Sequence, residues 1–165
     1  MEDFIVEFVA SSLVEISRVQ IGLIEAGFRA IHVRGDRMAT TSGLFDEFSA
    51  AFQFPYYFGR NWAGFAECMS DLDEWLPAGR AGYALLIWNS GTVLAAESRD
   101  EFAVFVKVLQ HIRTEHVART GLISTGDGKA VVPDPREFRI VLHSEQDEAT
   151  ATAGKWTDAG ARIQV

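Results

Sequence analysis

The chain has 165 residues, which is enough for one domain with a hydrophobic core. Hydrophobic residues make up 48% and charged residues 23%, an ordinary globular composition that argues against disorder. The formal net charge of −8 disfavours direct binding of nucleic acid or of anionic membranes, and it favours a basic partner.

The first elements predicted along the chain are a strand, a helix and a second strand. Aromatic and β-branched residues in Phe4–Val9 predict a strand. Ser12, with Glu15 three residues later, predicts a capping box that opens a helix, and Gly27 is placed to end it. The apolar segment inside Arg29–Gly35 predicts a buried strand.

Two helices and a third strand are predicted next. Ser42 is expected to cap a helix that ends before Pro55. An aromatic turn then leads into a helix predicted over Trp62–Leu76, and the almost continuously apolar Tyr83–Trp88 predicts a strand covered on both faces. The residues expected to face inward from the first of these helices are Leu44, Phe48, Ala51 and Phe52.

A long helix and a strand follow. Ser98 and Glu101 have the spacing of a second capping box, and the helix after them is predicted to end near Val117. Its expected buried residues include Phe105, and Phe138–His143 is the last strong strand. Strands separated by helices of this length predict an α/β fold with a parallel sheet.

Three segments are predicted to be irregular or marginal. Residues 121–135 are rich in turn residues and predict a loop or hairpin. Residues 145–155 are polar and predict a mobile link, and Arg162–Val165 predicts a short edge strand.

The sequence lacks the motifs and segments that several classes of protein require. Cys68 is the only cysteine, so an intramolecular disulfide and a cysteine-based metal site are excluded. No apolar run approaches the ~18 residues of a membrane span. Met1–Asp3 is acidic rather than positive, so a signal peptide is not expected and we expect a cytoplasmic location. Gly126–Lys129 lacks the full pattern of a phosphate-binding loop.

The histidines form no metal-binding pattern. His111 and His116 lie five residues apart on a predicted helix and therefore point in different directions. His32 and His143 fall in predicted strands, where structural histidines are the common outcome. No metal, cofactor or catalytic residue is predicted, although an enzyme using Glu67 with His111 or His32 stays as an alternative.

The helix after the aromatic turn has one apolar face and one acidic face. Glu67, Asp71 and Glu74 share the acidic face with Ala63 and Ser70. Beside the aromatic turn, this face favours a docking surface for a basic partner, and a simple solvated face is the alternative. The apolar stripe on the other side consists of Trp62, Phe65, Met69, Leu72 and Leu76.

Residues Pro55–Leu72 read Pro-x-Tyr-Phe-Gly-x-Asn-Trp-x-x-Phe-x-Glu-Cys-Met-x-Asp-Leu, and this motif resembles the barstar family of intracellular ribonuclease inhibitors. The order of predicted elements extends the resemblance from Ala30 to His143. It implies one domain over residues 1–165, with a small parallel sheet flanked by helices over 29–144. Residues 1–28 would then be an added strand–helix unit, and 145–165 a C-terminal extension.

The resemblance also implies a function. Family members are not enzymes, and they plug the active site of a nuclease with an acidic helix and the loop before it. We therefore expect an inhibitor or immunity protein for a basic ribonuclease or nuclease toxin. The alternative is an interaction or scaffold module with a non-nuclease partner, in which the extra terminal segments supply an oligomer contact or regulatory interface and Phe4–Val9 matters more than Glu67. The expected partner-binding residues are Tyr57, Arg60, Asn61, Trp62, Ala63, Ala66, Glu67, Ser70 and Asp71. In the family's motif, the position of Asn61 is the residue that opens the helix.

The motif also departs from the family pattern. Glu67 stands where the family usually has its central aspartate, whereas Ala63 and Ala66 replace a common acid and an interface aromatic. The acid that the family contributes from its third helix has no clear counterpart around Lys107–His111. We expect from these departures that the same surface serves a different partner.

Overall fold

The computed structural model describes residues 4–72, 79–119 and 137–165. Within these ranges, five parallel strands form one sheet in the order β2-β3-β4-β1-β5. The strands are β1 (Ile5–Ala10), β2 (Phe28–Arg34), β3 (Gly82–Trp88), β4 (Glu137–Ser144) and β5 (Arg162–Gln164). The helices are α1 (Leu13–Glu25), α2 (Thr41–Phe52), α3 (Trp62–Ser70), α4 (Arg99–Arg119) and α5 (Ala149–Asp158). The predicted α/β fold with a parallel sheet and flanking helices is confirmed.

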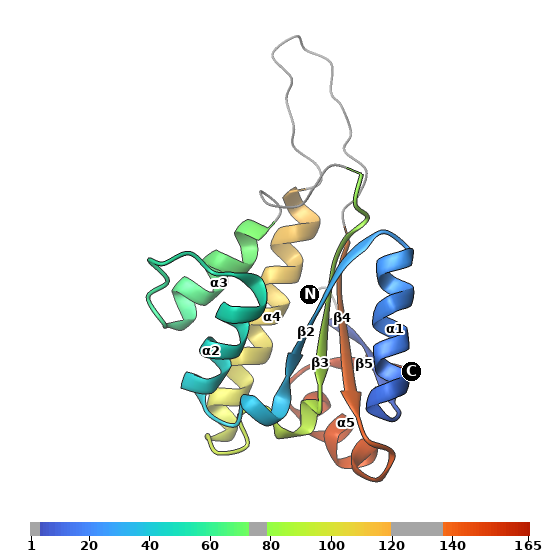
Figure 1. Cartoon of the computed structure of the whole chain (residues 1–165). Helices are drawn as coiled ribbons and strands as arrows, with labels where there is room; N and C mark the ends of the chain where they lie inside the picture. Colours follow the sequence, from blue (N-terminus) through green and yellow to red (C-terminus); the bar gives the residue numbers. More distant parts are fainter. Residues whose placement is uncertain (1–3, 73–78, 120–136) are drawn as a thin grey trace.

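Helices cover the two faces of the sheet unequally. Helices α2, α3 and α4 lie on one face, α1 lies on the other, and α5 lies near the carboxyl ends of the strands (Figure 1). Alternate strand residues such as Leu85 and Ile140 point into the larger core beneath α2, α3 and α4. Their neighbours Leu86 and Val141 meet Ile16 of α1 in a smaller core. The three-helix face therefore holds most of the buried apolar surface.

The caps of the first two helices decide where these helices begin. The predicted capping box is confirmed, since the Glu15 N–H donates to Ser12 Oγ at 3.3 Å and the Ser12 N–H to Glu15 Oε2 at 2.9 Å. The prediction that Ser42 caps α2 is wrong, because Thr40 has the extended backbone that a cap requires and its Oγ1 accepts from the Gly43 N–H at 3.1 Å. Ser42 already lies inside the helix.

Other boundaries lie close to their predicted positions. Helix α4 begins where the Glu101 N–H donates to Ser98 Oγ at 3.1 Å, and it ends at Arg119, two residues beyond the prediction. No helix in the described ranges is both long and apolar enough to cross a membrane. The predicted loop over 121–135 lies outside the described residues. Helix α3 ends at Ser70, before the end predicted at Leu76.

The predicted mobile link over residues 145–155 is wrong. This segment forms a short 3-10 turn (Gln146–Glu148) and most of α5. Thr152 and Trp156, four residues apart, bury one face of α5, and the Trp156 indole N–H donates to the Ser90 carbonyl at 3.1 Å. Of the polar residues that suggested a linker, Gln146, Asp147, Glu148 and Thr150 are exposed, whereas the half-buried Lys155 donates to the Gly91 and Val93 carbonyls. The edge strand predicted over Arg162–Val165 is confirmed as β5, which pairs with β1.

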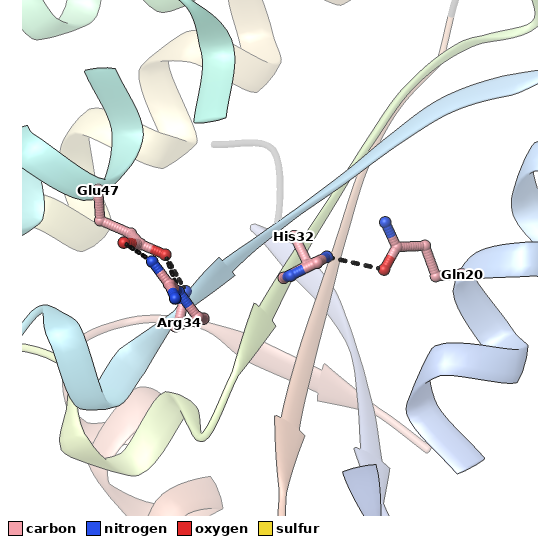
Figure 2. A network of polar contacts seen from close by, with 4 residues as sticks. All are labelled: Gln20, His32, Arg34 and Glu47. Atoms are coloured by element: carbon pink, nitrogen blue, oxygen red, sulfur yellow. Dashed lines mark hydrogen bonds and ion pairs between the residues drawn. The ribbon is translucent and has the colours of Figure 1, made fainter. Parts of the chain in front are cut away.

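Strand β2 was predicted to be buried, but it is a half-exposed edge strand. Side chains occupy backbone groups on its open edge: the Arg34 N–H donates to Glu47 Oε1 at 3.0 Å, and the Ala30 carbonyl accepts from Gln20 Nε2 at 3.2 Å. The Arg34 guanidinium also donates two hydrogen bonds, of 2.7 and 2.9 Å, to the Glu47 carboxylate (Figure 2). Glu47 and Gln20 therefore shield the two ends of this edge from another strand.

His32 lies between these two capped positions. Its ring stacks on Trp88 with centroids 3.9 Å apart, and its Nδ1 lies 3.0 Å from Gln20 Oε1 (Figure 2). Burial is the main cause that lowers the pKa of His32, and the charge of Arg34 adds to it. The His32 ring thus packs against the edge of the sheet, and its burial disfavours the charged form.

Removing both caps should make the protein self-associate through β2. In the double variant Gln20→Ala, Glu47→Ala, unpaired backbone groups at Ala30 and Arg34 become available to a second strand. We expect sedimentation velocity to show dimers or larger species whose share rises with concentration. The control Arg18→Ala, Ser49→Ala alters the same two helices and should stay like the wild type. A double variant that also stays unchanged would show that these side chains do not protect the edge.

Candidate functional site

The loop between α2 and α3 divides its aromatic residues between the core and solvent. It leaves α2 through Gln53, which has a left-handed backbone (φ 54°), and it turns where the Phe58 N–H donates to the Pro55 carbonyl at 3.0 Å. Phe58 packs edge-on against the buried Phe45 with centroids 5.6 Å apart. Tyr57, in contrast, is 68% exposed, so the loop presents a tyrosine ring beside α3.

Helix α3 starts with the cap that the motif predicts. Asn61 Oδ1 accepts from the Gly64 N–H at 2.8 Å. Phe65 and Met69, four residues apart, are fully buried and fix the inner face of the helix against the large core. Because these positions are fixed, Ala63 and Glu67 point to solvent and Ala66 is half-buried.

Trp62 does not lie on the outer face where partner contacts were predicted. Its ring packs edge-on against Phe45 at 5.1 Å, and its indole N–H donates to Glu101 Oε1 on α4 at 2.8 Å. Glu101 also accepts from the Thr41 hydroxyl at 3.2 Å, so one carboxylate ties α2, α3 and α4 together. Trp62 positions the surface rather than forming it.

Replacing the indole donor should cost stability. Trp62→Phe keeps most of the ring packing but removes a hydrogen bond to a charged acceptor, and we expect a loss of about 1.5–3 kcal/mol in the free energy of unfolding. Urea unfolding of Trp62→Phe, Glu101→Gln and the double variant forms a cycle that isolates the pair. Additive single effects would contradict this role.

Only part of the predicted acidic face lies in the described residues. Helix α3 ends at Ser70, Asp71 begins a tighter turn, and Glu74 lies outside the described residues. Ser70 is 7% exposed, so its predicted place on the binding face is wrong: it lies next to Met69 on the inward side of the last turn. Glu67 and the half-buried Asp71 are the two carboxylates that the structure places on this side.

Glu67 is exposed and makes no hydrogen bond or ion pair with any residue in the described ranges. Arg60, the nearby cation of the loop, turns instead to α2, where it pairs with Asp46 at 2.5 Å and donates to Ser42 Oγ at 2.9 Å. Arg60 has a left-handed backbone (φ 51°). The exposed Glu67 carboxylate therefore has no cationic partner among the described residues.

Tyr57, Glu67 and Asp71 meet at the rim of a cavity of about 330 Å³ between α3, the end of α2 and the open side of β2. We refer to it as the α3 pocket. Its remaining polar rim is formed by Arg29, Gln53 and Cys68. Its apolar wall consists of Ile31, Phe52, Phe54, Pro55, Leu72 and Tyr83.

The wall of the α3 pocket was not predicted from sequence. Ile31 belongs to β2, which was expected to be covered, and Tyr83 was expected to lie in a closed core. The missed signal is the placement of β2 at the sheet edge, which leaves Arg29 and Ile31 next to the α3 helix. Tyr83 is anchored from beneath by its hydroxyl, which donates to the Leu72 carbonyl at 3.0 Å.

The pKa of the Cys68 thiol depends on the burial and the charges around the α3 pocket. Burial is the main cause that raises its pKa, and the negative charges of Glu67 and Asp71 raise it further. Cys68 is consequently a poor nucleophile, and its surroundings favour positive charge.

A larger cavity of about 550 Å³ lies along β1, β4 and β5. Two of the charged residues that line it pair with each other, since Arg139 donates from Nε and Nη2 to the two Glu7 oxygens, both at 2.7 Å. This cavity lies outside the helix and loop that carry the predicted partner contacts.

The histidines do not join the acidic surface. Among the described residues, none that lines the α3 pocket is a histidine. His143 accepts from the Asn89 N–H at 3.1 Å and lies 2.9 Å from the Ser11 carbonyl, while His116 lies 3.0 Å from the Met69 carbonyl. The structural reading of His32 and His143 is confirmed. Nor does any group of three or more His, Cys, Asp or Glu in the described ranges have the arrangement of a metal site.

Comparison with known proteins places this surface in a family. The model of the family described as Barstar (barnase inhibitor) matches residues 28–125, which begin at β2 and include α2, the aromatic loop, α3, β3 and α4. The chain belongs to the barstar family. The barstar match begins after α1 and stops before β4, so β1, α1, α5 and β5 lie outside it. The description of the family names an inhibitor, and the matched residues include Tyr57 and Glu67.

Other comparisons add little to the barstar assignment. No curated protein matches the chain. Two solved structures of the Drosophila ORC, one bound to AT-rich DNA and Cdc6 and one bound to DNA, resemble it at 10% and 8% identity, both with a TM-score of 0.46. Each comparison covers 98% of this chain, but 48% of the first ORC chain and 79% of the second. The chain thus spans about half the length of the first, and a likeness this low carries no argument.

Proposed function

We propose that this chain is an inhibitor or immunity protein that binds a basic ribonuclease or nuclease toxin inside the cell. The binding surface would consist of Tyr57, the exposed side of α3 and Asp71. The observation that carries the proposal is the Glu67 carboxylate, which is exposed and has no partner among the described residues, on a helix that the barstar match includes. The proposed role is non-enzymatic.

The physical basis is electrostatic. A nuclease binds its substrate through cationic groups aimed at phosphates, and a carboxylate presented from a rigid helix can occupy the same groups. A net charge of −8 adds long-range attraction to a basic protein, which speeds association and weakens as salt is added. Because Asn61 and Phe65 fix α3, little ordering is needed before Glu67 binds.

The proposed contacts are shifted along α3 relative to the motif pattern. Ala63 and Ala66 leave the first turns of the helix without charge, whereas Glu67 and Asp71 concentrate it near the helix end. This placement supports a partner whose basic groups reach toward the α3 pocket. Arg60 and Asn61 would contribute at the loop side.

Capture followed by an inhibition assay tests the proposal. The immobilised full chain is exposed to lysate and secreted proteins of the source cell, and each captured basic nuclease is assayed for RNA or DNA cleavage with and without the chain. We expect at least one nuclease to be inhibited at a one-to-one ratio, less strongly in high salt. Failure to inhibit any captured or candidate nuclease would reject it.

The alternative, a barstar-fold interaction module with a non-nuclease partner, has one observation in its favour. The outer face of α1 exposes Val14 (62%), Ile21 (53%) and Ile24 (47%), and α1 lies outside the barstar match. Within the N-terminal segment, α1 rather than Phe4–Val9 offers this surface, because β1 pairs with both β4 and β5 inside the sheet. Ile21→Glu should abolish any oligomer formed through α1, as measured by light scattering, and should leave nuclease inhibition intact.

A further inference from the structure

We infer that the α3 pocket is a binding site for a single arginine side chain of the partner protein. This inference rests on the proposed function, and it adds a second contact in which a side chain of the partner enters this chain. Besides presenting Glu67 to the partner, the chain would receive one of the partner's basic side chains between α3 and β2.

The shape and lining of the cavity support this occupant. A volume of about 330 Å³ lies at the small end of ligand sites, so it suits one side chain rather than a folded segment. Its wall is apolar, as the methylene stem of an arginine requires, and it includes Phe52 and Leu72. Its rim carries the carboxylates of Glu67 and Asp71, which can accept hydrogen bonds from a planar guanidinium.

The charges around the rim give the pocket a net negative sign. Three charged side chains in the described part of the chain line it: Glu67, Asp71 and Arg29. Arg29 projects from β2, and Glu67 and Asp71 lie on and just after α3. Cys68, which also lines the cavity, has its pKa raised mainly by burial and further by the charges of Glu67 and Asp71. Tyr57, 68% exposed, supplies a ring face on which a guanidinium can stack.

Cys68 makes the pocket directly testable, because it is the only cysteine of the chain and lines the cavity. Its thiolate attacks a methanethiosulfonate to form a mixed disulfide and release methanesulfinate. The trimethylammonium-ethyl and sulfonatoethyl reagents differ in charge, and their rates are compared in the full chain and in N-acetylcysteine amide. Both reagents react with the same thiolate, so the ratio of the cationic reagent's rate to the anionic reagent's rate does not depend on the thiol pKa.

We expect this ratio to be higher in the protein than in N-acetylcysteine amide. Glu67→Gln and Asp71→Asn should each lower it by about threefold, the effect of one nearby charge in a wet site. Asp158→Asn, which removes an exposed carboxylate from α5, is the matched control and should leave it unchanged. A ratio insensitive to Glu67 and Asp71 would overturn the inference.

The occupant itself is tested with N-acetylarginine amide against its neutral isostere, N-acetylcitrulline amide. At concentrations on the order of 10–100 mM, the affinity range of one side chain, arginine should slow alkylation of Cys68 by neutral iodoacetamide at least twofold. Citrulline should not slow it at matched ionic strength. Equal protection by both, or protection by neither, would overturn the assignment of the site to arginine.

These readouts need no nuclease, so they separate the two proposals. If arginine protects Cys68 but no nuclease is inhibited, the arginine site is supported and the proposal of a nuclease partner is rejected. Nuclease inhibition without protection by arginine would keep the binding surface and reject the pocket.

Discussion

Trp156→Ala is expected to lower the free energy of unfolding by about 3–5 kcal/mol, the range for removing a large buried aromatic. The ring is fully buried, packs edge-on against Phe102 with centroids 5.1 Å apart, and donates a hydrogen bond to the Ser90 carbonyl. The substitution would leave a cavity between α5 and α4 and an unsatisfied buried carbonyl. Urea unfolding followed by circular dichroism measures the loss.

The control for Trp156→Ala is Thr157→Ala, which alters an exposed position of the same helix. It should change stability by no more than about 0.5 kcal/mol. If Trp156→Ala were equally mild, α5 would be a peripheral appendage, and the sequence-based expectation of a mobile segment would be restored.

Glu67→Arg is expected to weaken binding to the proposed basic partner by at least 2–5 kcal/mol, which is the typical cost of losing one member of a close charge pair. The reversal also adds repulsion between like charges. Stability should stay within about 0.5 kcal/mol of the wild type, because the Glu67 side chain is exposed and has no partner in the described ranges. Isothermal titration calorimetry and thermal unfolding measure the two effects separately.

Asp158→Arg is the matched charge reversal for Glu67→Arg, since it makes the same change on exposed α5. It should weaken association only through net charge, an effect that disappears in about 0.5 M salt. Equal losses for the two variants at high salt would mean that the chain attracts its partner without a specific contact at Glu67.

The sequence predicts the strands and helices whose signals are local. The capping box at Ser12 and Glu15, the apolar run of β3 and the Asn61 cap each depend on residues close in sequence, and each is confirmed. The order of elements and the helix lengths were enough for the parallel sheet.

Features set by packing between distant elements were not predicted. Trp62 was placed among the partner contacts because an aromatic residue beside acids is common at interfaces, but its N–H finds Glu101, 39 positions away. The α5 helix was missed because its polar residues outnumber its buried ones, which are Thr152 and Trp156. The α3 pocket depends on which strand lies at the sheet edge, and strand order is not written in any local pattern.

The position of β1 has a consequence for how the chain folds during synthesis. Glu7 of this strand pairs with Arg139, 132 positions later, and β1 lies between β4 and β5, both of which leave the ribosome long after it. Until they emerge, β1 has two open edges and exposes Val6 and Phe8, whose side chains are buried in the finished protein. Such distant pairing slows folding, so the nascent chain has an interval in which a chaperone or a neighbouring nascent chain can capture this strand.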